Sequence, residues 1–286
     1  HGLTVIIPQG VAADLRRLTH ARKRAVCDLT AKSNQMQQLV FIIFPEFFTI
    51  MKKAVSKSAL YLLKNYTLPE DILHFGDKRL EAVLRKVSRG RLCNQRAREF
   101  IEAAHQSVGI DQGARSIVLE IKHIVDSIEN TQQFIVTLET QMEEYLQQIS
   151  YSQNILSHKG IGVITVAGLI GEVGNFSAFS TIKELEKLAG LDLYEISSGA
   201  HKGERRISKR GRSLMRKLLY CAALNTIRVD GIMHQQYQNM LGRGMPKVKA
   251  VVAISRRLLR IIFAIVRDNT MFEVTHCSKT CLKKVS

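Results

Sequence analysis

"ARSIVLEIKHIVDSIENTQQFIVTLETQMEEYLQQIS" (Ala114 to Ser150) is the stretch that decides the fold class. Apolar residues recur alternately three and four positions apart along it, and no glycine or proline interrupts it. This spacing places a continuous apolar stripe on one face of an α-helix. The helix would be roughly 54 Å long at about 1.5 Å per residue. Only Thr131 interrupts the stripe, whose positions are Ile117, Ile121, Ile124, Ile128, Thr131, Ile135, Leu138, Met142, Tyr145 and Ile149.

A second stripe with the same spacing lies near the start of the chain and predicts another long helix. Its positions are Leu15, Leu18, Arg22, Ala25, Leu29, Lys32, Met36, Leu39 and Ile43. Two interpretations of the stripes stay open. They pack against each other within one chain, or they join two chains in a dimer.

The rest of the sequence also favours helices, because it has only four prolines and β-branched residues rarely alternate over a strand length. We therefore predict a mainly α fold: a long helical hairpin or coiled coil with a helical insert, followed by a helical domain that contains a helix-hairpin-helix. The predicted ranges are coiled-coil helices at 1–44 and 114–150, an insert at 45–113, a carboxy-terminal domain at 151–270 and a basic tail at 271–286.

The insert carries two features of interest. "TLPEDILHFG" has Pro69 near its start, acidic residues after it and Gly76 at its end, which is the pattern of a short helix. "RKVSRGRLCNQRAR" is basic, and it is either a nucleic-acid face or a solvated helix surface.

The charge balance indicates the class of partner. Lys and Arg total 42 against 25 Asp and Glu, a formal net charge of +17. An excess of this size predicts a polyanion, either nucleic acid or an anionic membrane surface. No apolar run approaches the roughly 18 residues of a membrane-spanning helix. The five cysteines are scattered, as in proteins of a reducing compartment. We therefore expect nucleic acid, no membrane, and a cytoplasmic location.

"SHKGIGVITVAGLIGEVG" (Ser157 to Gly174) predicts a tight turn that leads into a helix. Gly160 and Gly162 lack a Cβ, so a phosphate oxygen could approach the amides at the helix start. Lys159 and Thr165 would supplement those amides. The pattern resembles a helix-hairpin-helix, which grips the DNA backbone without reading sequence. An ordinary helix–helix turn is the alternative.

"LAGLDLYEISSGAHKGERRISKRGRSLMRKLLYCAA" holds the densest positive charge of the chain. We expect its Ser-Ser-Gly to lie in a loop, followed by a helix that begins near Ser213. A hydroxyl beside many cations suits attack on a phosphodiester, because the cations stabilise the charge of the transition state. His201 and Glu195 are candidate local bases. Spacing alone favours ordinary loop residues over catalysis.

That segment resembles the signature of bacterial insertion-sequence transposases of the one-hundred-and-ten type. "ILSHKGIGVITVAGLIGEVGNFSAFSTIKELEKLAGL", "GRGMPKVKAVVAISRRLLRIIFAIVRD" and "IPQGVAADLRRLTHARKRAVCDLTAKSNQMQQLVFIIFPEF" are similar to other parts of the same family. The resemblance thus extends over nearly the whole chain.

The resemblance implies specific roles. Ser198, which precedes Gly199, would be the nucleophile that forms a phosphoserine link to DNA. The family couples this serine to an amino-terminal RuvC-like domain that holds Mg²⁺ with four acidic residues, and the present sequence opens where that domain should just have ended. No acidic quartet replaces it, so we expect no metal site in this chain and no recombination by this chain alone.

The resemblance also implies partners: double-stranded DNA, a homodimer or tetramer, and a guide RNA in some members. We expect Lys159, Gly160, Gly162 and Thr165 to hold one backbone phosphate. Around the scissile phosphate we expect Gly199, Lys202, Arg205, Arg206, Lys209 and Arg210. Two other functions remain open: a non-catalytic dimeric architectural DNA-binding protein, and an RNA-binding module centred on the basic insert from Arg85 to Arg98.

Overall fold

A computed structural model of the chain describes residues 7–92, 94–198 and 201–273, without the side chains of residues 196–204. Helices dominate the described part, so the predicted mainly α fold class is confirmed. The described helices include none that is long and apolar enough to cross a membrane. The chain forms two compact units: a middle unit of residues 23–137 and a terminal unit of residues 1–22 and 138–286. The predicted domain ranges stay a prediction.

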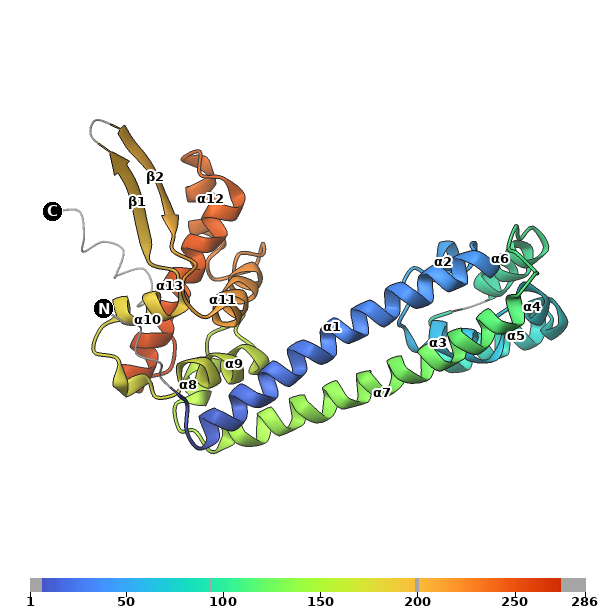
Figure 1. The fold of residues 1–286 in the computed structure, drawn as a ribbon, viewed down its shortest axis with the longest axis horizontal. Coiled ribbons are helices and arrows are strands. Elements are labelled where there is room, and N and C mark those ends of the chain that lie inside the picture. Colours follow the sequence, from blue (N-terminus) through green and yellow to red (C-terminus); the bar gives the residue numbers. More distant parts are fainter. Residues whose placement is uncertain (1–6, 93, 199–200, 274–286) are drawn as a thin grey trace. The chain divides into compact units, whose positions relative to one another are not determined.

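The two long helices form where the stripes predict them, as α1 (Val11–Ile43) and α7 (Ala114–Gln147) (Figure 1). Every stripe position is buried or half-buried. In the middle unit the helices are joined by the Lys32 Nζ, which donates to the Thr131 Oγ1 at 3.3 Å. In the terminal unit the Arg22 Nε donates to the Glu139 carboxylate at 2.6 Å. Packing within one chain therefore accounts for the burial of both stripes.

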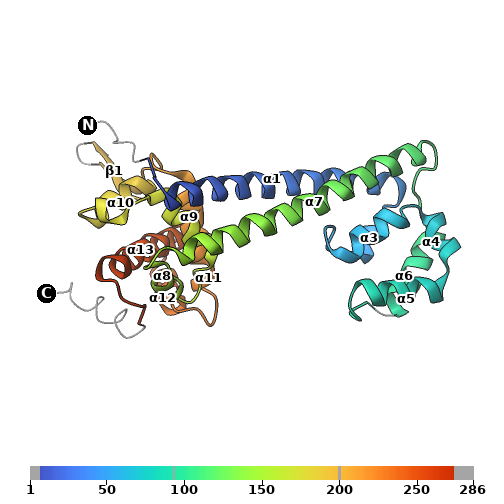
Figure 2. The ribbon, with the colours of Figure 1, turned by 90° about the horizontal axis from the view of Figure 1, so that it is seen from below.

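The middle unit completes its core with short helices from the predicted insert (Figure 2). Helix α6 contacts α2, α4 and α5, which surround it. The predicted helix after Thr67 is present, and Gly76 ends it at a φ of +77°. The helices of the insert are α2 (Phe47–Ile50), α3 (Lys57–Asn65), α4 (Pro69–Phe75), α5 (Asp77–Val87) and α6 (Asn94–His105).

The terminal unit is built around α11, which contacts both α9 and α13, and the three helices share one apolar core. Helix α9 is buried from Val166 to Val173. A Cβ on Gly171 would lie 2.6 Å from the backbone nitrogen of Arg16, so glycine permits the close approach of α1. The elements are α8 (Ser152–Leu156), α9 (Val163–Val173), η1 (Phe176–Ala178), α10 (Ile182–Ala189), β1 (Leu193–Ser198), β2 (His201–Ile207), α11 (Ser213–Thr226), α12 (His234–Gly242) and α13 (Lys247–Asp268).

A buried ion cluster ties α10 to α13. The Glu186 side chain is 6% exposed, and it accepts hydrogen bonds from the Arg256 Nη2 and the Arg260 Nε, each at 2.7 Å. Burial by itself would raise the pKa of Glu186, but the hydrogen bonds from Arg260 and Arg256 outweigh burial and lower it. The two arginines are therefore structural partners of a carboxylate in this unit.

Glu186→Gln should lower the free energy of unfolding by on the order of 2–3 kcal/mol near neutral pH. The change leaves the largely buried Arg256 without its counter-charge; a fully buried pair costs roughly 3–5 kcal/mol to break, and the half-exposed Arg260 reduces that figure. Urea unfolding of both proteins measures the difference. Glu144→Gln removes an exposed carboxylate from α7 and should change little.

The pH dependence checks the cause. The folded pKa of Glu186 lies below its unfolded value of about 4.3, so its stabilisation is present above that value and is lost as the pH falls through the folded pKa. The gap between wild type and Glu186→Gln should therefore close in acid. A gap that stays constant down to acid pH would contradict the ion cluster.

Candidate functional site

Ser198 lies at the end of a β-strand, so its predicted place in a loop is wrong. Strands β1 and β2 form an antiparallel hairpin, and Ser198 pairs with His201 at its far end. Figure 1 shows the two strands extending together beyond α10 and α11. Leu193 and Tyr194 are 48% and 42% exposed. The ribbon is thus poorly covered by the core, and no apolar alternation marks it in the sequence.

The hairpin has a bulge between its base and the serine. Glu195 pairs with Arg205, whereas Ser197 pairs with Lys202, so β2 contributes one more residue than β1 over this interval. A bulge bends the strand and increases its local twist. The backbone at Ser198 is therefore aimed differently from a regular continuation of the strands.

The base of the hairpin is locked by two glycines in contact. A Cβ on Gly211 would lie 2.2 Å from the Gly190 nitrogen, and Gly190 itself has a left-handed φ of +64°. Arg216 donates from one Nη to the carbonyls of Ala189 at 2.9 Å and Gly211 at 3.0 Å. The two ends of the hairpin are thus held together where it joins the helices.

A buried carboxylate fixes the junction between the hairpin and α11. Glu172 lies on α9 with a side chain that is 3% exposed. Its carboxylate lies 2.8 Å from the His20 Nε2, 3.7 Å from the Arg16 Nε and 3.6 Å from an Arg212 Nη. Arg212, directly before α11, also donates to the Glu172 backbone carbonyl. Three separate segments of the terminal unit therefore meet at Glu172.

The structure sorts the predicted basic cluster into two groups. Arg212 and Arg216 hold the fold, as described above. Lys209 and Arg210 are exposed where β2 leads into α11. Arg205 is also exposed, and its Nε lies 2.8 Å from the Glu195 carboxylate. Glu195, one of the two candidate bases, is therefore engaged in an ion pair. Arg206 is exposed on β2. Gly199 lies outside the described residues, as do the side chains of Ser198, Lys202 and His201.

The predicted turn lies between α8 and α9. Gly160 has a φ of +102°, whereas Gly162 has a φ of −98°, so of these two glycines only Gly160 occupies the left-handed region. Ile161 is 5% exposed and packs in the core with Ile155 and Val166. The predicted contacts Lys159, Gly160 and Gly162 are exposed, and Thr165 is half-buried in the first turn of α9.

The turn and the hairpin do not form one cluster. A Cβ on Gly160 would lie 2.7 Å from the Thr226 side chain, at the end of α11, whereas the hairpin enters α11 at Ser213. The 14 residues of this helix span about 21 Å. The two predicted sets of phosphate contacts therefore lie on the same unit at opposite ends of α11.

His158 is a residue that the sequence did not signal. It is fully buried, and neither ring nitrogen has a hydrogen-bond partner among the described residues. Its ring lies 4.2 Å from that of Phe272. Burial lowers the pKa of His158. The neutral His158 ring packs among apolar side chains and so supports the turn that begins at Lys159.

The Mg²⁺ that the resemblance implies does not fit the described residues. Nowhere in residues 7–92, 94–198 and 201–273 do three or more His, Cys, Asp or Glu side chains gather as metal ligands would. Tail residues His276, Cys277 and Cys281 lie outside the described part.

Comparison with known proteins identifies the relatives of this chain. Residues 152–238, from α8 into α12, match the family described as "Transposase IS116/IS110/IS902 family". The chain resembles bacterial IS110-type transposases. It is 27% identical to the insertion element IS900 uncharacterized 42 kDa protein of Mycobacterium paratuberculosis, over 92% of this chain and 66% of that protein. The insertion element IS110 uncharacterized 43.6 kDa protein of Streptomyces coelicolor is 22% identical over 92% of this chain and 65% of that protein.

The similarity extends to proteins that are not named after insertion elements. A pilin gene-inverting protein of Moraxella lacunata is 28% identical over 52% of this chain and 48% of that protein. The chain spans about two thirds of the length of the insertion-element relatives. The IS110-type resemblance read from the sequence is therefore confirmed.

Gly211→Ala should detach the base of the hairpin. Its methyl group would meet backbone atoms of Leu188 and Gly190, which cannot rotate away. We expect a loss of roughly 2–3 kcal/mol in unfolding free energy, as for an overpacked core, and faster proteolysis between β1 and α11. Gly242→Ala is the control, because a Cβ there meets nothing within 4 Å. Equal behaviour of the two variants would contradict the locked base.

His158→Leu should make the terminal unit less sensitive to acid. The folded pKa of His158 lies below the unfolded value of about 6.5, so the unfolded chain binds more protons as the pH falls through this interval. The wild type therefore loses stability as the pH falls from about 8 to about 5.5, and the variant should lose less. Thermal melting at both pH values measures this. His123→Leu, at an exposed position of α7, should retain the wild-type dependence.

Proposed function

We propose that this chain is the carboxy-terminal part of a DNA transposase or recombinase that binds double-stranded DNA and supplies Ser198 as the nucleophile. The observation that carries the proposal is the position of Ser198. It ends a hairpin whose base is locked by Gly190 and Gly211, within the segment that matches the transposase family. A rigid base favours catalysis, because reacting groups must be held in a defined geometry.

The proposed step is a transesterification. The Ser198 Oγ forms a bond to a backbone phosphorus, and the bond from that phosphorus to the leaving sugar oxygen breaks. The hydroxyl proton ends on the leaving oxygen. Negative charge builds up on the phosphoryl oxygens during the attack, and nearby cations stabilise it. Lys202, Arg205, Arg206, Lys209 and Arg210 are the proposed source of this charge.

A second contact would hold the same duplex at the α8–α9 turn. The amides of Val163 and Ile164 open α9, and no side chain caps them. Such amides favour an anion, and the exposed Lys159 adds charge beside them. The length of α11, about 21 Å, equals roughly six base-pair steps of 3.4 Å. One duplex could therefore contact both ends of the helix.

The Ser198 hydroxyl would have to be activated before it could attack a phosphate. A serine hydroxyl is a weak nucleophile without a base or metal. Glu195, one candidate base, is held by Arg205. The resemblance assigns activation to a RuvC-like domain with Mg²⁺. We therefore propose that the chain alone binds DNA without cleaving it, and that the active assembly is a homodimer or tetramer.

The central experiment joins the chain to a RuvC-like domain from a close relative and supplies guide RNA, DNA substrates and Mg²⁺. A protein–DNA adduct that survives denaturation should form, and Ser198→Ala should abolish it. Ser197→Ala is the matched control and should retain the adduct. An adduct that persists in Ser198→Ala would remove Ser198 as the nucleophile.

The alternative is an architectural DNA-binding protein. It would bind DNA tightly, form no adduct in the joined protein, and be indifferent to Ser198→Ala. Cleavage of DNA by the present chain alone would overturn the proposal that this chain binds DNA without cleaving it.

A further inference from the structure

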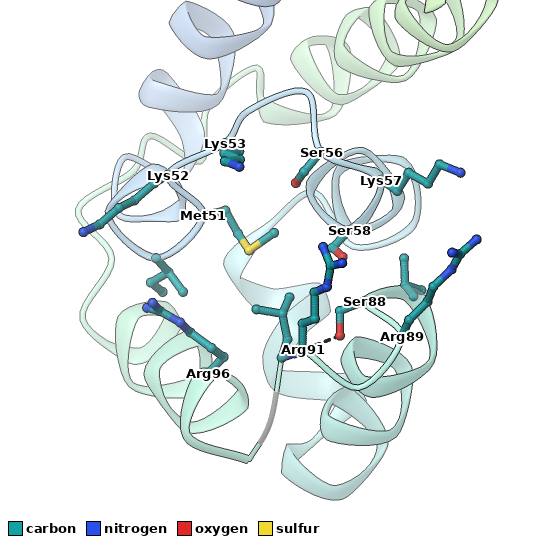
Figure 3. A pocket seen from close by; sticks show the side chains of 13 residues that line it. Met51, Lys52, Lys53, Ser56, Lys57, Ser58, Ser88, Arg89, Arg91 and Arg96 are labelled. Carbon is teal, nitrogen blue, oxygen red and sulfur yellow. Dashed lines mark hydrogen bonds between the residues drawn. The ribbon is translucent and has the colours of Figure 1, made fainter. Parts of the chain in front are cut away.

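The middle unit contains a basic hollow that the proposed function does not use. It lies between the α2–α3 connection and the α5–α6 connection, and it has a volume of about 500 Å³ (Figure 3). Its cationic residues, here called the hollow cations, are Lys52, Lys53, Lys57, Arg89, Arg91 and Arg96. They belong to the middle unit, whereas Ser198 belongs to the terminal unit.

The hollow cations lack compensating charge. No acidic residue lines the hollow. Arg96 pairs with Glu99 at 2.6 Å, and the other five have no acidic partner among the described residues. By contrast, Lys64 in the same unit contacts both Asp126 and Glu129. Like charges held close together repel each other, so an anion that enters the hollow relieves that repulsion.

The floor of the hollow is apolar. Ile50 and Met51 are buried, and Val87 and Leu92 complete the floor. Figure 3 shows the Met51 side chain in the middle of the hollow, with Lys52 and Arg96 on one side and Ser56 and Ser58 on the other. An inorganic anion could bind through the hollow cations alone and would make no use of the apolar floor. A ligand with an aromatic ring and phosphates can use the floor and the rim together.

Hydrogen-bonding groups add to the rim. Ser56 caps α3, with its Oγ accepting from the Ala59 amide at 3.3 Å, and Lys57 begins the helix. The first turn of α3 contains no acidic residue. Its partial positive charge therefore adds to that of the hollow cations.

We propose that the hollow binds an unpaired nucleotide of a nucleic-acid strand, with the base on the apolar floor and its flanking phosphates on the hollow cations. The bases of a duplex are stacked inside it. A duplex can therefore present only its backbone to the hollow, and its bases cannot reach the recessed apolar floor. Unpaired nucleotides in loops and single strands expose the base to a protein pocket. The volume of the hollow lies in the range of small-ligand sites, about 300–1,000 Å³.

The test measures binding of the full chain to fluorescent 12-nucleotide single strands, one of RNA and one of DNA, and to the matching DNA duplex, by anisotropy. The triple variant Lys53→Ala, Arg89→Ala and Arg91→Ala removes three hollow cations. The control variant Arg79→Ala, Arg115→Ala and Lys122→Ala removes three exposed cations of the same unit outside the hollow. Circular dichroism and melting check that both variants fold.

The triple variant should bind single strands at least about tenfold more weakly than the control variant, with a smaller loss for the duplex. Each lost phosphate contact lowers the salt slope of single-strand binding by about 0.7, so three contacts lower it by roughly 2. RNA bound more tightly than DNA of the same sequence identifies RNA as the source of the strand, and the reverse order identifies DNA. Equal losses in the two variants would overturn the hollow as a site.

A second variant tests the floor without a change of charge. Val87→Phe fills part of the hollow, so it should weaken single-strand binding several-fold and leave binding of inorganic polyphosphate unchanged. Equal effects on both ligands, or no effect on either, would overturn the nucleotide assignment. Neither readout involves the Ser198 adduct, so this proposal and the proposed function fail separately.

Discussion

The terminal unit depends on the ion pairs that surround the buried carboxylate of Glu172. A carboxylate in the core is costly unless cations and donors surround it, and here Arg16, His20 and Arg212 do so. These partners come from α1 and from the segment that joins β2 to α11. The same interaction that makes burial of Glu172 tolerable thus sets where the hairpin leaves the core. Gly171 beside it brings the α1 backbone within reach.

The hairpin combines a rigid base with exposed strands. At the base, Gly190 and Gly211 exclude side chains, and Arg216 satisfies two carbonyls. Beyond the base, Tyr194 and Arg205 are exposed, so little apolar packing holds the strands. A two-stranded ribbon has marginal stability by itself. Its geometry is therefore set by its anchor.

Sequence reasoning predicted the long helices and missed the hairpin for related physical reasons. A helix that packs along its whole length has an apolar stripe on one face. On α7 the buried residues Ile121, Ile128 and Met142 belong to such a stripe. The strands of the ribbon bury no continuous face, so residues 193–207 show no alternation. The helix that begins at Ser213 was predictable, but the contact between Arg212 and Glu172 joins positions 40 residues apart. No local pattern encodes such a contact.

The excess of positive charge could be predicted from the sequence, but the role of each cation could not. Composition counts every Lys and Arg alike, and spacing alone treats residues 202–217 as one basic cluster. In the fold, Arg212, Arg256 and Arg260 neutralise buried carboxylates, which removes them from the pool that can meet a polyanion. The cations that keep their charge exposed lie in both units, at Lys209 in one and at Arg91 in the other, for example. A partner that satisfies only one unit leaves the repulsion in the other unrelieved. The distribution of uncompensated charge is therefore what both proposals need, because each of the two proposed nucleic-acid sites draws on the cations of its own unit.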